Sequence, residues 1–309
     1  MTRKKIVVFG SFITDLTSHS SCLPIPGETL KGKSFKSGPG GKGSNQAVAA
    51  HRAGADVLLI TKLGDDVFGR DALNFYISEN MSIEGILTDK KYPTGCALIM
   101  VSDDTGQNMI VVVPSVCEHF TEEDLDISRK HIDKADILLA QLETNIEATA
   151  EVLRYAKSKD CITILNPAPA QPLSEDILSN VDIITPNETE ASVLSGLIVD
   201  DKPENIRAAA QKFIENGIKK VIITLGENGV YGTDGTEELF WPANAPAPVV
   251  DTTGAGDAFS GGFVAGLSFG YGFFEAIRYA SVVSGLSVTK FGTAPAMPNV
   301  DEIAKYFKK

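Results

Sequence analysis

The residues best suited to chemistry lie in the stretch 249–259, which reads Val-Val-Asp-Thr-Thr-Gly-Ala-Gly-Asp-Ala-Phe. Its two leading β-branched residues are typical of the end of a strand, and the apolar residues after Ala255 are typical of a helix. The first turn of a helix leaves backbone N–H groups unpaired at the positive end of the helix dipole. Gly254, Ala255 and Gly256 are therefore predicted to bind an anion, and a phosphate is the obvious candidate.

Asp257 is the unusual member of this stretch, because a carboxylate beside a phosphate site repels the ligand. Two interpretations stay open. In the first, Asp257 takes a proton from a hydroxyl group that attacks phosphorus. In the second, it only complements the positive end of the helix dipole, as aspartates in first turns often do.

A second glycine-rich stretch, 38–46, precedes a helical pattern at 47–54. Its glycines would let the backbone approach a ligand closely. The stretch does not match the Walker loop, and no dinucleotide fingerprint follows the first strand, which disfavours a dehydrogenase. A flexible turn is the structural alternative, although Lys42 and Asn45 supply polar groups that a turn does not need.

These residues must be positioned by a sheet, and the rest of the chain predicts one. Strand-like apolar runs alternate with helical patterns, which predicts a doubly wound, mostly parallel α/β sheet with helices on both faces. The expected strands are 5–10, 57–61, 137–140, 162–165, 181–185 and 221–225, and the expected helices include 47–54, 69–79, 146–157 and 203–216.

Polar residues and glycines follow the predicted strands, where open α/β sheets bind their ligands. We expect one edge of the sheet to carry Asp15, Gly41, Glu143, Asn187, Thr224 and Asp257. Asn187 and Glu190 also have the spacing of a capping box, so a purely structural role is at least an equal alternative.

One interval breaks the alternation. Two β-rich runs, 94–101 and 108–113, are separated by a polar turn and no helix, which predicts a hairpin that acts as a flap. Residues 23–39 are rich in proline and glycine, which is typical of irregular or edge-strand structure.

Composition restricts the class of protein. The 309 residues are 43% hydrophobic and 22% charged, with a net charge of -12, as expected for a globular chain with one main domain. This acidity argues against a nucleic-acid-binding surface. No run reaches the roughly 20 apolar residues of a membrane span. The four cysteines are dispersed, which favours reduced thiols in a cytoplasm.

The stretches 40–47 and 251–262 resemble the two signatures of the PfkB-type carbohydrate kinases. Similarity to the ribokinase group of this family runs nearly end to end, including 26–29, 166–170 and 185–190. The resemblance implies a single ribokinase-like domain over 1–309. It also implies a small β lid, formed from roughly 12–37 and 92–115, that tends to pair two subunits into a homodimer.

The resemblance further implies an enzyme that uses ATP, Mg²⁺ and K⁺ to phosphorylate the primary (5-) hydroxyl of a pentose, D-ribose in the first instance. Asp257 would be the base, and Gly254, Ala255 and Gly256 the anion hole. The sugar contacts would be Asp15, Gly41, Lys42, Gly43, Asn45, Glu143 and Asp257. The nucleotide contacts would be Asn187, Thr224, Gly226, Gly229 and Gly256. Glu190 would order Mg²⁺ through water, and K⁺ would lie among Asp251, Thr253, Ser287, Lys290, Gly292 and Ala296.

The chain departs from the ribokinase pattern at two places. Ile13 replaces the usual Asn two residues before Asp15, and 115–117 reads Ser-Val-Cys instead of Gly-Ala-Asn. A lost amide leaves a sugar hydroxyl unsatisfied at a cost of about 1–3 kcal/mol, so a 2-deoxyribose kinase is a serious alternative. The structural alternative is that Ile13 only packs against the wall of the pocket. Another PfkB-type sugar or nucleoside kinase, or a catalytically idle sugar or nucleotide sensor, also stays open.

Overall fold

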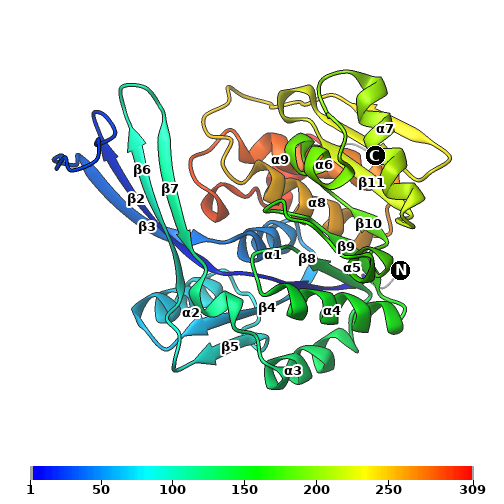
Figure 1. The fold of residues 1–309 in the computed structure, drawn as a ribbon, viewed down its shortest axis with the longest axis horizontal. Helices are drawn as coiled ribbons and strands as arrows, with labels where there is room; N and C mark the ends of the chain where they lie inside the picture. Colours follow the sequence, from blue (N-terminus) through cyan, green and yellow to red (C-terminus); the bar gives the residue numbers. More distant parts are fainter. Residues whose placement is uncertain (1–2, 308–309) are drawn as a thin grey trace.

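The computed structural model describes residues 3–307 and shows a large sheet with helices on both faces and a small sheet beside it (Figure 1). The large sheet has the strand order β13-β12-β11-β10-β9-β8-β1-β4-β5. Its strands are β1 Lys5–Phe9, β4 Asp56–Gly64, β5 Ile86–Asp89, β8 Ile137–Ala140, β9 Ile162–Leu165, β10 Ile183–Ile184, β11 Lys220–Thr224, β12 Val230–Thr233 and β13 Glu238–Trp241. Pairing is parallel except at β12 and β13.

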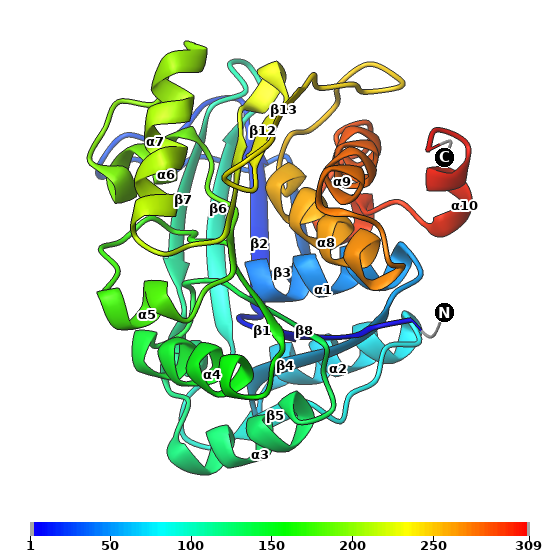
Figure 2. The ribbon, with the colours of Figure 1, turned by 90° about the vertical axis from the view of Figure 1, so that its right-hand side faces the viewer.

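The two faces of the large sheet carry separate apolar cores, because side chains alternate along a strand. On β1, Ile6 and Val8 pack in one core, whereas Val7 and Phe9 pack in the other. Figure 2 shows the helices divided between the faces. The first core lies under α1 Lys42–Arg52, α2 Val67–Ser78, α8 Ala255–Ser268, α9 Phe273–Ser287 and α10 Val300–Ala304, and the second under α3 Glu122–Ile132, α4 Ile146–Ser158, α5 Glu175–Ser179, α6 Glu188–Ser195 and α7 Pro203–Glu215. The predicted doubly wound α/β architecture is confirmed.

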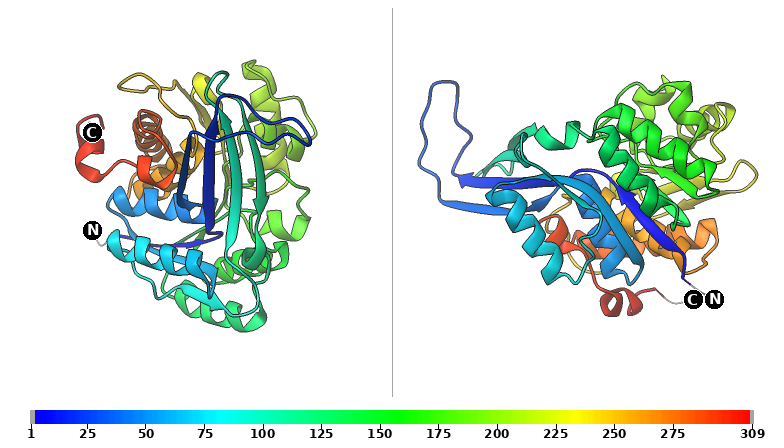
Figure 3. Two further views of the ribbon diagram at one scale, coloured as in Figure 1. Left: turned by 90° about the vertical axis from the view of Figure 1, so that its left-hand side faces the viewer. Right: turned by 90° about the horizontal axis from the view of Figure 1, so that it is seen from below.

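The small sheet has four strands, in the order β3-β2-β6-β7, which lie side by side in Figure 3. The predicted hairpin is present as β6 Gly95–Ser102 and β7 Asn108–Val113, and β3 Ser34–Gly40 forms the other edge. Asp15 was expected just past the end of the first strand, and it does follow β1, but it lies in a strand of its own. It belongs to β2 Ile13–Ser20, which pairs with β3 and, in parallel, with β6.

Two further boundaries differ from the prediction. Helix α1 begins at Lys42, so the second half of the glycine-rich stretch is helical. Its Gly43 has no room for a side chain, since a Cβ would lie 2.6 Å from the carbonyl carbon of Gly10 at the end of β1. Val249 and Val250 do not end a strand. They form an irregular segment in which the Val250 N–H donates to the Val288 carbonyl at 2.8 Å.

Helices α1 and α8 cross closely at Gly261. A Cβ there would lie 2.5 Å from the Gln46 carbonyl oxygen and 2.5 Å from the Ala49 Cβ. The absence of a side chain thus lets the start of α1 reach the start of α8. Within residues 3–307, none of the helices combines the length and hydrophobicity that a membrane crossing requires.

We expect Gly261→Ala to separate these two helices and to lower the free energy of unfolding by about 1–3 kcal/mol, because overpacking forces the backbone to shift. Urea unfolding followed by circular dichroism measures the change. Gly272→Ala is the control, since no atom lies within 4 Å of its Cβ position. Equal stability of the two variants would contradict the close crossing.

Candidate active site

The start of α8 forms the predicted anion site, although no strand precedes it. Gly254 is the N-cap residue, with φ 77°, and its carbonyl accepts the Ala258 N–H at 2.8 Å. Within residues 3–307, no hydrogen bond is found from the N–H groups of Gly256 and Asp257. These amides are free to bind an anionic ligand at the positive end of the helix dipole.

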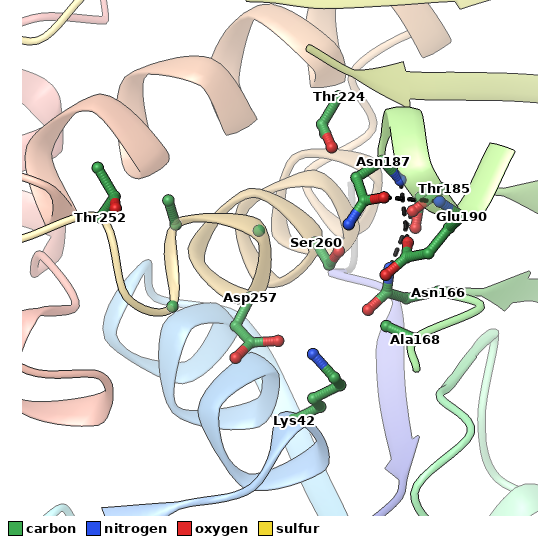
Figure 4. A pocket seen from close by; sticks show the side chains of 13 residues that line it. Lys42, Asn166, Ala168, Thr185, Asn187, Glu190, Thr224, Thr252, Asp257 and Ser260 are labelled. Carbon is green, nitrogen blue, oxygen red and sulfur yellow. Dashed lines mark hydrogen bonds between the residues drawn. The ribbon is translucent and has the colours of Figure 1, made fainter. Parts of the chain in front are cut away.

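A polar cavity of about 190 Å³ opens at this helix start (Figure 4). Its walls come from the carboxyl ends of several strands and from the first turns of α1, α6 and α8. The lining residues are Lys42, Asn166, Ala168, Thr185, Asn187, Glu190, Thr224, Thr252, Gly254, Ala255, Gly256, Asp257 and Ser260. The cavity therefore brings together the two glycine-rich stretches of the sequence.

Asp257 is only 8% exposed, and α1 supplies its hydrogen-bond donors. Asn45 Nδ2 donates to Asp257 Oδ2 at 2.9 Å, and Gln46 Nε2 donates to Asp257 Oδ1 at 2.9 Å. Burial raises the pKa of Asp257, while Lys42 and the two amides oppose this increase. The carboxylate is thus held in position and has a raised affinity for a proton, as a general base requires.

Lys42 is the cation of the cavity, and Figure 4 shows its ammonium group pointing toward Asp257. Burial lowers the pKa of Lys42. The carboxylates of Asp257, Glu143 and Glu190 together raise it by more, so its pKa lies above the ordinary value of a lysine. The Lys42 backbone N–H also donates to Glu143 Oε2 at 2.8 Å. Glu143 accepts a second bond from the Ser11 hydroxyl.

Asp15 faces this group of charges from β2. Its burial, followed by the nearby carboxylates of Glu143 and Asp257, raises the pKa of Asp15 to about 6. A Cβ on Gly40 would lie 2.4 Å from Asp15 Oδ2. Gly41 is the N-cap of α1 with φ 87°, a conformation that favours glycine. Among the residues predicted to contact a sugar, Asp15, Lys42, Asn45, Glu143 and Asp257 thus carry neighbouring side chains, and Gly41 and Gly43 supply backbone beside them.

The residues predicted to contact a nucleotide divide into two groups. Asn187 and Glu190 form a complete capping box at the start of α6, with the Asn187 N–H donating to Glu190 Oε2 at 2.9 Å. Both also line the cavity, together with Thr224. Gly226 and Gly229 lie in the turn after β11, with φ 52° and 99°, and neither lines the cavity.

The segments predicted to hold K⁺ lie next to each other. The Asp251 carboxylate accepts the N–H groups of Thr253 and Gly292, both at 2.9 Å. The Ser287 hydroxyl donates to the Ser284 carbonyl, and the Lys290 ammonium group donates to Glu302. An ammonium group has no lone pair, so Lys290 could offer a cation only its backbone carbonyl. Ala296 is buried in a short 3-10 helix, Ala294–Ala296.

Sequence reasoning missed several lining residues, and a usable signal existed for two of them. Asn166 and Thr185 come directly after β9 and β10, so the same strand-end rule that singled out Glu143 applies to them. Ser260 lies one helical turn after Asp257. Thr252 and Ala168 lie in the stretches 251–262 and 166–170 that carry the family resemblance, but neither was assigned a contact.

The two departures from the ribokinase pattern are neighbours in space. Ile13, Val116 and Cys117 pack with Ala97 in one buried apolar cluster, and the Cys117 thiol donates to the Phe12 carbonyl at 3.3 Å. Ile13 is the first residue of β2 in the small sheet, two residues before Asp15. The structural reading of Ile13, as a residue packed in the wall beside the site, agrees with this placement.

The chain resembles sugar kinases along its whole length. Residues 3–300 match the pfkB family carbohydrate kinases. The chain is 38% identical to a ribokinase from Haemophilus influenzae over 307 residues, covering 99% of each. It is 34% identical to a deoxyribokinase from Salmonella typhi over 307 residues, covering 97% of this chain and 98% of the other. The structure of Arabidopsis thaliana ribokinase complexed with ribose and ATP has a TM-score of 0.90 and 29% identity, with 100% of both chains covered. With the unpaired amides that start α8 and the buried carboxylate of Asp257 in place, the match over residues 3–300 shows that the chain belongs to the pfkB family of carbohydrate kinases.

Proposed function

We propose that this protein transfers the γ-phosphoryl group of ATP to the primary (5-) hydroxyl of D-ribose, giving ribose 5-phosphate and ADP. The observation that carries the proposal is the buried carboxylate of Asp257 beside the unpaired amides that start α8. The names of the relatives, which include a ribokinase and a ribokinase complexed with ribose and ATP, support the choice of substrates.

In the proposed reaction, Asp257 accepts the proton of the sugar hydroxyl. The oxygen of that hydroxyl forms a bond to the γ-phosphorus of ATP. The bond between the γ-phosphorus and the bridging oxygen breaks, and that oxygen leaves with ADP. The amides of Gly254 and Gly256, and that of Ala255 once it releases the Thr252 carbonyl to which it donates at 3.2 Å, would stabilise the charge on the transferring group. Lys42, which lines the same cavity, adds a positive charge. The small sheet would act as a lid that excludes water.

The sugar would bind between the small sheet and α1. The side-chain oxygen of Asn45 is buried and has no hydrogen-bond partner within residues 3–307, so it would accept a bond from a sugar hydroxyl. Asp15 and Glu143 would accept others. Asn187 and Thr224 would hold the nucleotide, with Gly226 and Gly229 beside it.

Glu190 fits the predicted Mg²⁺ role. It is a buried carboxylate that lines the cavity, and burial raises its pKa, which a cation would offset. The part of the chain that the structure describes has no cluster of three metal-binding side chains, in keeping with a Mg²⁺ ion bound mostly by water and phosphate. Such an ion would neutralise phosphate charge.

We propose a K⁺ site beside the anion site. The Asp251 carboxylate accepts the Thr253 N–H within its own loop and the Gly292 N–H of the second loop, so the two loops lie together. Backbone carbonyls suit a large monovalent cation.

We also propose a cytoplasmic homodimer. Every residue of β7 is exposed, including the apolar run from Met109 to Val113, and sedimentation equilibrium measures whether two copies associate.

The pKa of Asp15 predicts how the enzyme responds to pH. Because Asp15 has a pKa of about 6 and would accept hydrogen bonds from the sugar as a carboxylate, protonation weakens binding. We expect kcat/KM for the sugar to fall as the pH decreases through about 6, and this fall to become shallower in Asp15→Asn, in which only Asp257 still titrates. An identical pH profile in wild type and variant would remove Asp15 from the sugar site.

The choice between ribose and 2-deoxyribose is tested by steady-state kinetics with both sugars. Ile13 favours 2-deoxyribose as the alternative, because its apolar cluster offers no partner to an extra hydroxyl, and a deoxyribokinase is among the relatives. Ile13→Asn should raise the kcat/KM ratio of ribose to 2-deoxyribose by roughly tenfold to a hundredfold, the value of one buried hydrogen bond. An unchanged ratio means that Ile13 only packs. No ATP consumption with any pentose would refute the proposed function.

A further inference from the structure

We propose that Gln46 is a positioning residue that fixes Asp257 as the proton acceptor, through a directed chain of side-chain amides anchored on the backbone of the large sheet. This inference rests on the proposed role of Asp257 as the base. Gln46 lies one helical turn into α1, has no exposed surface, and does not line the cavity. It therefore acts through Asp257, without touching a ligand itself.

All the hydrogen-bonding groups of Gln46 are occupied. Its Nε2 donates both to Asp257 Oδ1 and to Asn166 Oδ1, each at 2.9 Å. Its Oε1 accepts the Nε2 group of Gln141 at 2.7 Å. The chain Gln141, Gln46, Asp257 thus leads from the carboxyl end of β8 to the cavity. Gly10 leaves the space for Gln141, because a Cβ there would lie 2.0 Å from its Oε1.

The direction of this chain is set by the backbone. The Thr185 carbonyl can only accept a hydrogen bond, and Asn166 Nδ2 donates to it at 2.9 Å. The oxygen of Asn166 must then face Gln46, so Gln46 must present its NH₂ group there. The same NH₂ group reaches Asp257. The end of β10 therefore ensures that Asp257 Oδ1 meets a donor, which favours the ionised carboxylate over the protonated form.

This donor matters because the surroundings of Asp257 otherwise oppose its charge. Burial raises the pKa of Asp257, and Glu143 adds to the increase. Asp15 and Glu190 are further carboxylates close enough to interact with it. Lys42 is the cation that opposes them, together with the amides of Asn45 and Gln46. A base that lost the Gln46 bond would be protonated over a larger part of the working pH range.

The test is the pH profile of kcat in Gln46→Met, which keeps the length of the side chain and removes its hydrogen bonds. A hydrogen bond to a charged group contributes about 1.5–3 kcal/mol, so we expect the acidic limb of kcat to move to a pH about one to two higher. At any pH on the acidic side of both limbs, kcat of the variant should be roughly tenfold to a hundredfold lower than kcat of the wild type. KM for sugar and ATP should change less than about twofold. Saturating sugar removes the effect of Asp15 on sugar affinity.

Two more variants complete the test. Gln141→Met removes only the far end of the chain and should move the limb in the same direction by a smaller amount, which keeps the proposal testable if Gln46→Met does not fold. Gln211→Met, on the exposed side of α7, should match wild type.

Each outcome has a separate meaning. An acidic limb that stays in place in Gln46→Met, or a rise in KM with kcat unchanged, overturns the role of Gln46. Should Asp257→Asn, measured in parallel, retain wild-type turnover, the assignment of the base itself fails.

Discussion

Asp257→Asn is expected to lower turnover by at least about a hundredfold while the protein still folds, because general-base catalysis contributes about 10²–10⁴ in rate. Asparagine has the shape of aspartate but cannot accept the proton of a hydroxyl that attacks phosphorus. The loss should appear in kcat with ribose and with 2-deoxyribose alike.

The control for this experiment is ligand binding. Isothermal titration should give similar affinities of the variant and the wild type for ADP, since Asn187 and Thr224 line a different wall of the cavity. Circular dichroism should report the same helix content. Turnover within about fivefold of wild type would show that Asp257 only complements the helix dipole.

Lys62→Met is expected to lower the free energy of unfolding by about 3–5 kcal/mol, the usual effect of breaking a buried ion pair, because it leaves two partly buried carboxylates without their cation. Lys62 is 3% exposed. Its Nζ lies 2.9 Å from Asp89 Oδ2 and 2.7 Å from Asp124 Oδ2, and it donates to the His119 carbonyl at 2.7 Å. Urea unfolding at pH 7 measures the change.

The matched control is the triple variant Lys62→Met, Asp89→Asn, Asp124→Asn, in which no charge is left unpaired and most of the stability should return. The pH dependence gives a second check. Lys62 lowers the pKa of Asp89 to about 2, so this stabilisation is present above about pH 4 and is lost as the pH falls through about 2. A loss below about 1 kcal/mol in Lys62→Met would mean that the cluster is not energetically coupled.

The Lys62 cluster also connects the two sheets. Asp89 ends β5, just before the chain enters the small sheet, and His119 and Asp124 lie where the chain returns from it. Tyr92 and His119, one on each connection, stack with ring centroids 3.6 Å apart. The cluster therefore holds together the two chain segments that join the β6–β7 hairpin to the large sheet.

Sequence patterns predicted the large sheet well because its strands are short buried runs of β-branched and aliphatic residues, such as 221–225, between amphipathic helices. They failed at β2, whose stability comes from partners about 20 and 80 residues away along the chain. They also failed at Val249 and Val250, where β-branched residues lie in an irregular segment that a carbonyl of residue 288 holds. Local propensity does not encode such distant partners.

The residues of the candidate site that lie at or after strand ends could be predicted from the sequence. Glu143 and Asn187 follow β8 and β10, Thr224 ends β11, and Asp15 lies in the strand after β1. The topology alone brings these residues near Asp257. Gln46 escaped notice, because nothing in a helical pattern distinguishes a buried glutamine that supports a carboxylate from one that faces solvent. That the loops at 251 and 292 meet was implied by the family resemblance and by no local pattern, since the two are about 40 residues apart.

The place of β1 in the large sheet has a consequence for synthesis. This strand leaves the ribosome early and pairs with β4 through Ile6 and Val57, but its other neighbour, β8, begins only at Ile137. The nascent chain therefore carries a strand with four consecutive apolar residues, 6–9, and one open side until more than 130 further residues have been translated. Such delayed, non-local pairing slows folding and exposes the chain to aggregation, so we expect its yield in cells to depend on chaperones and on growth temperature.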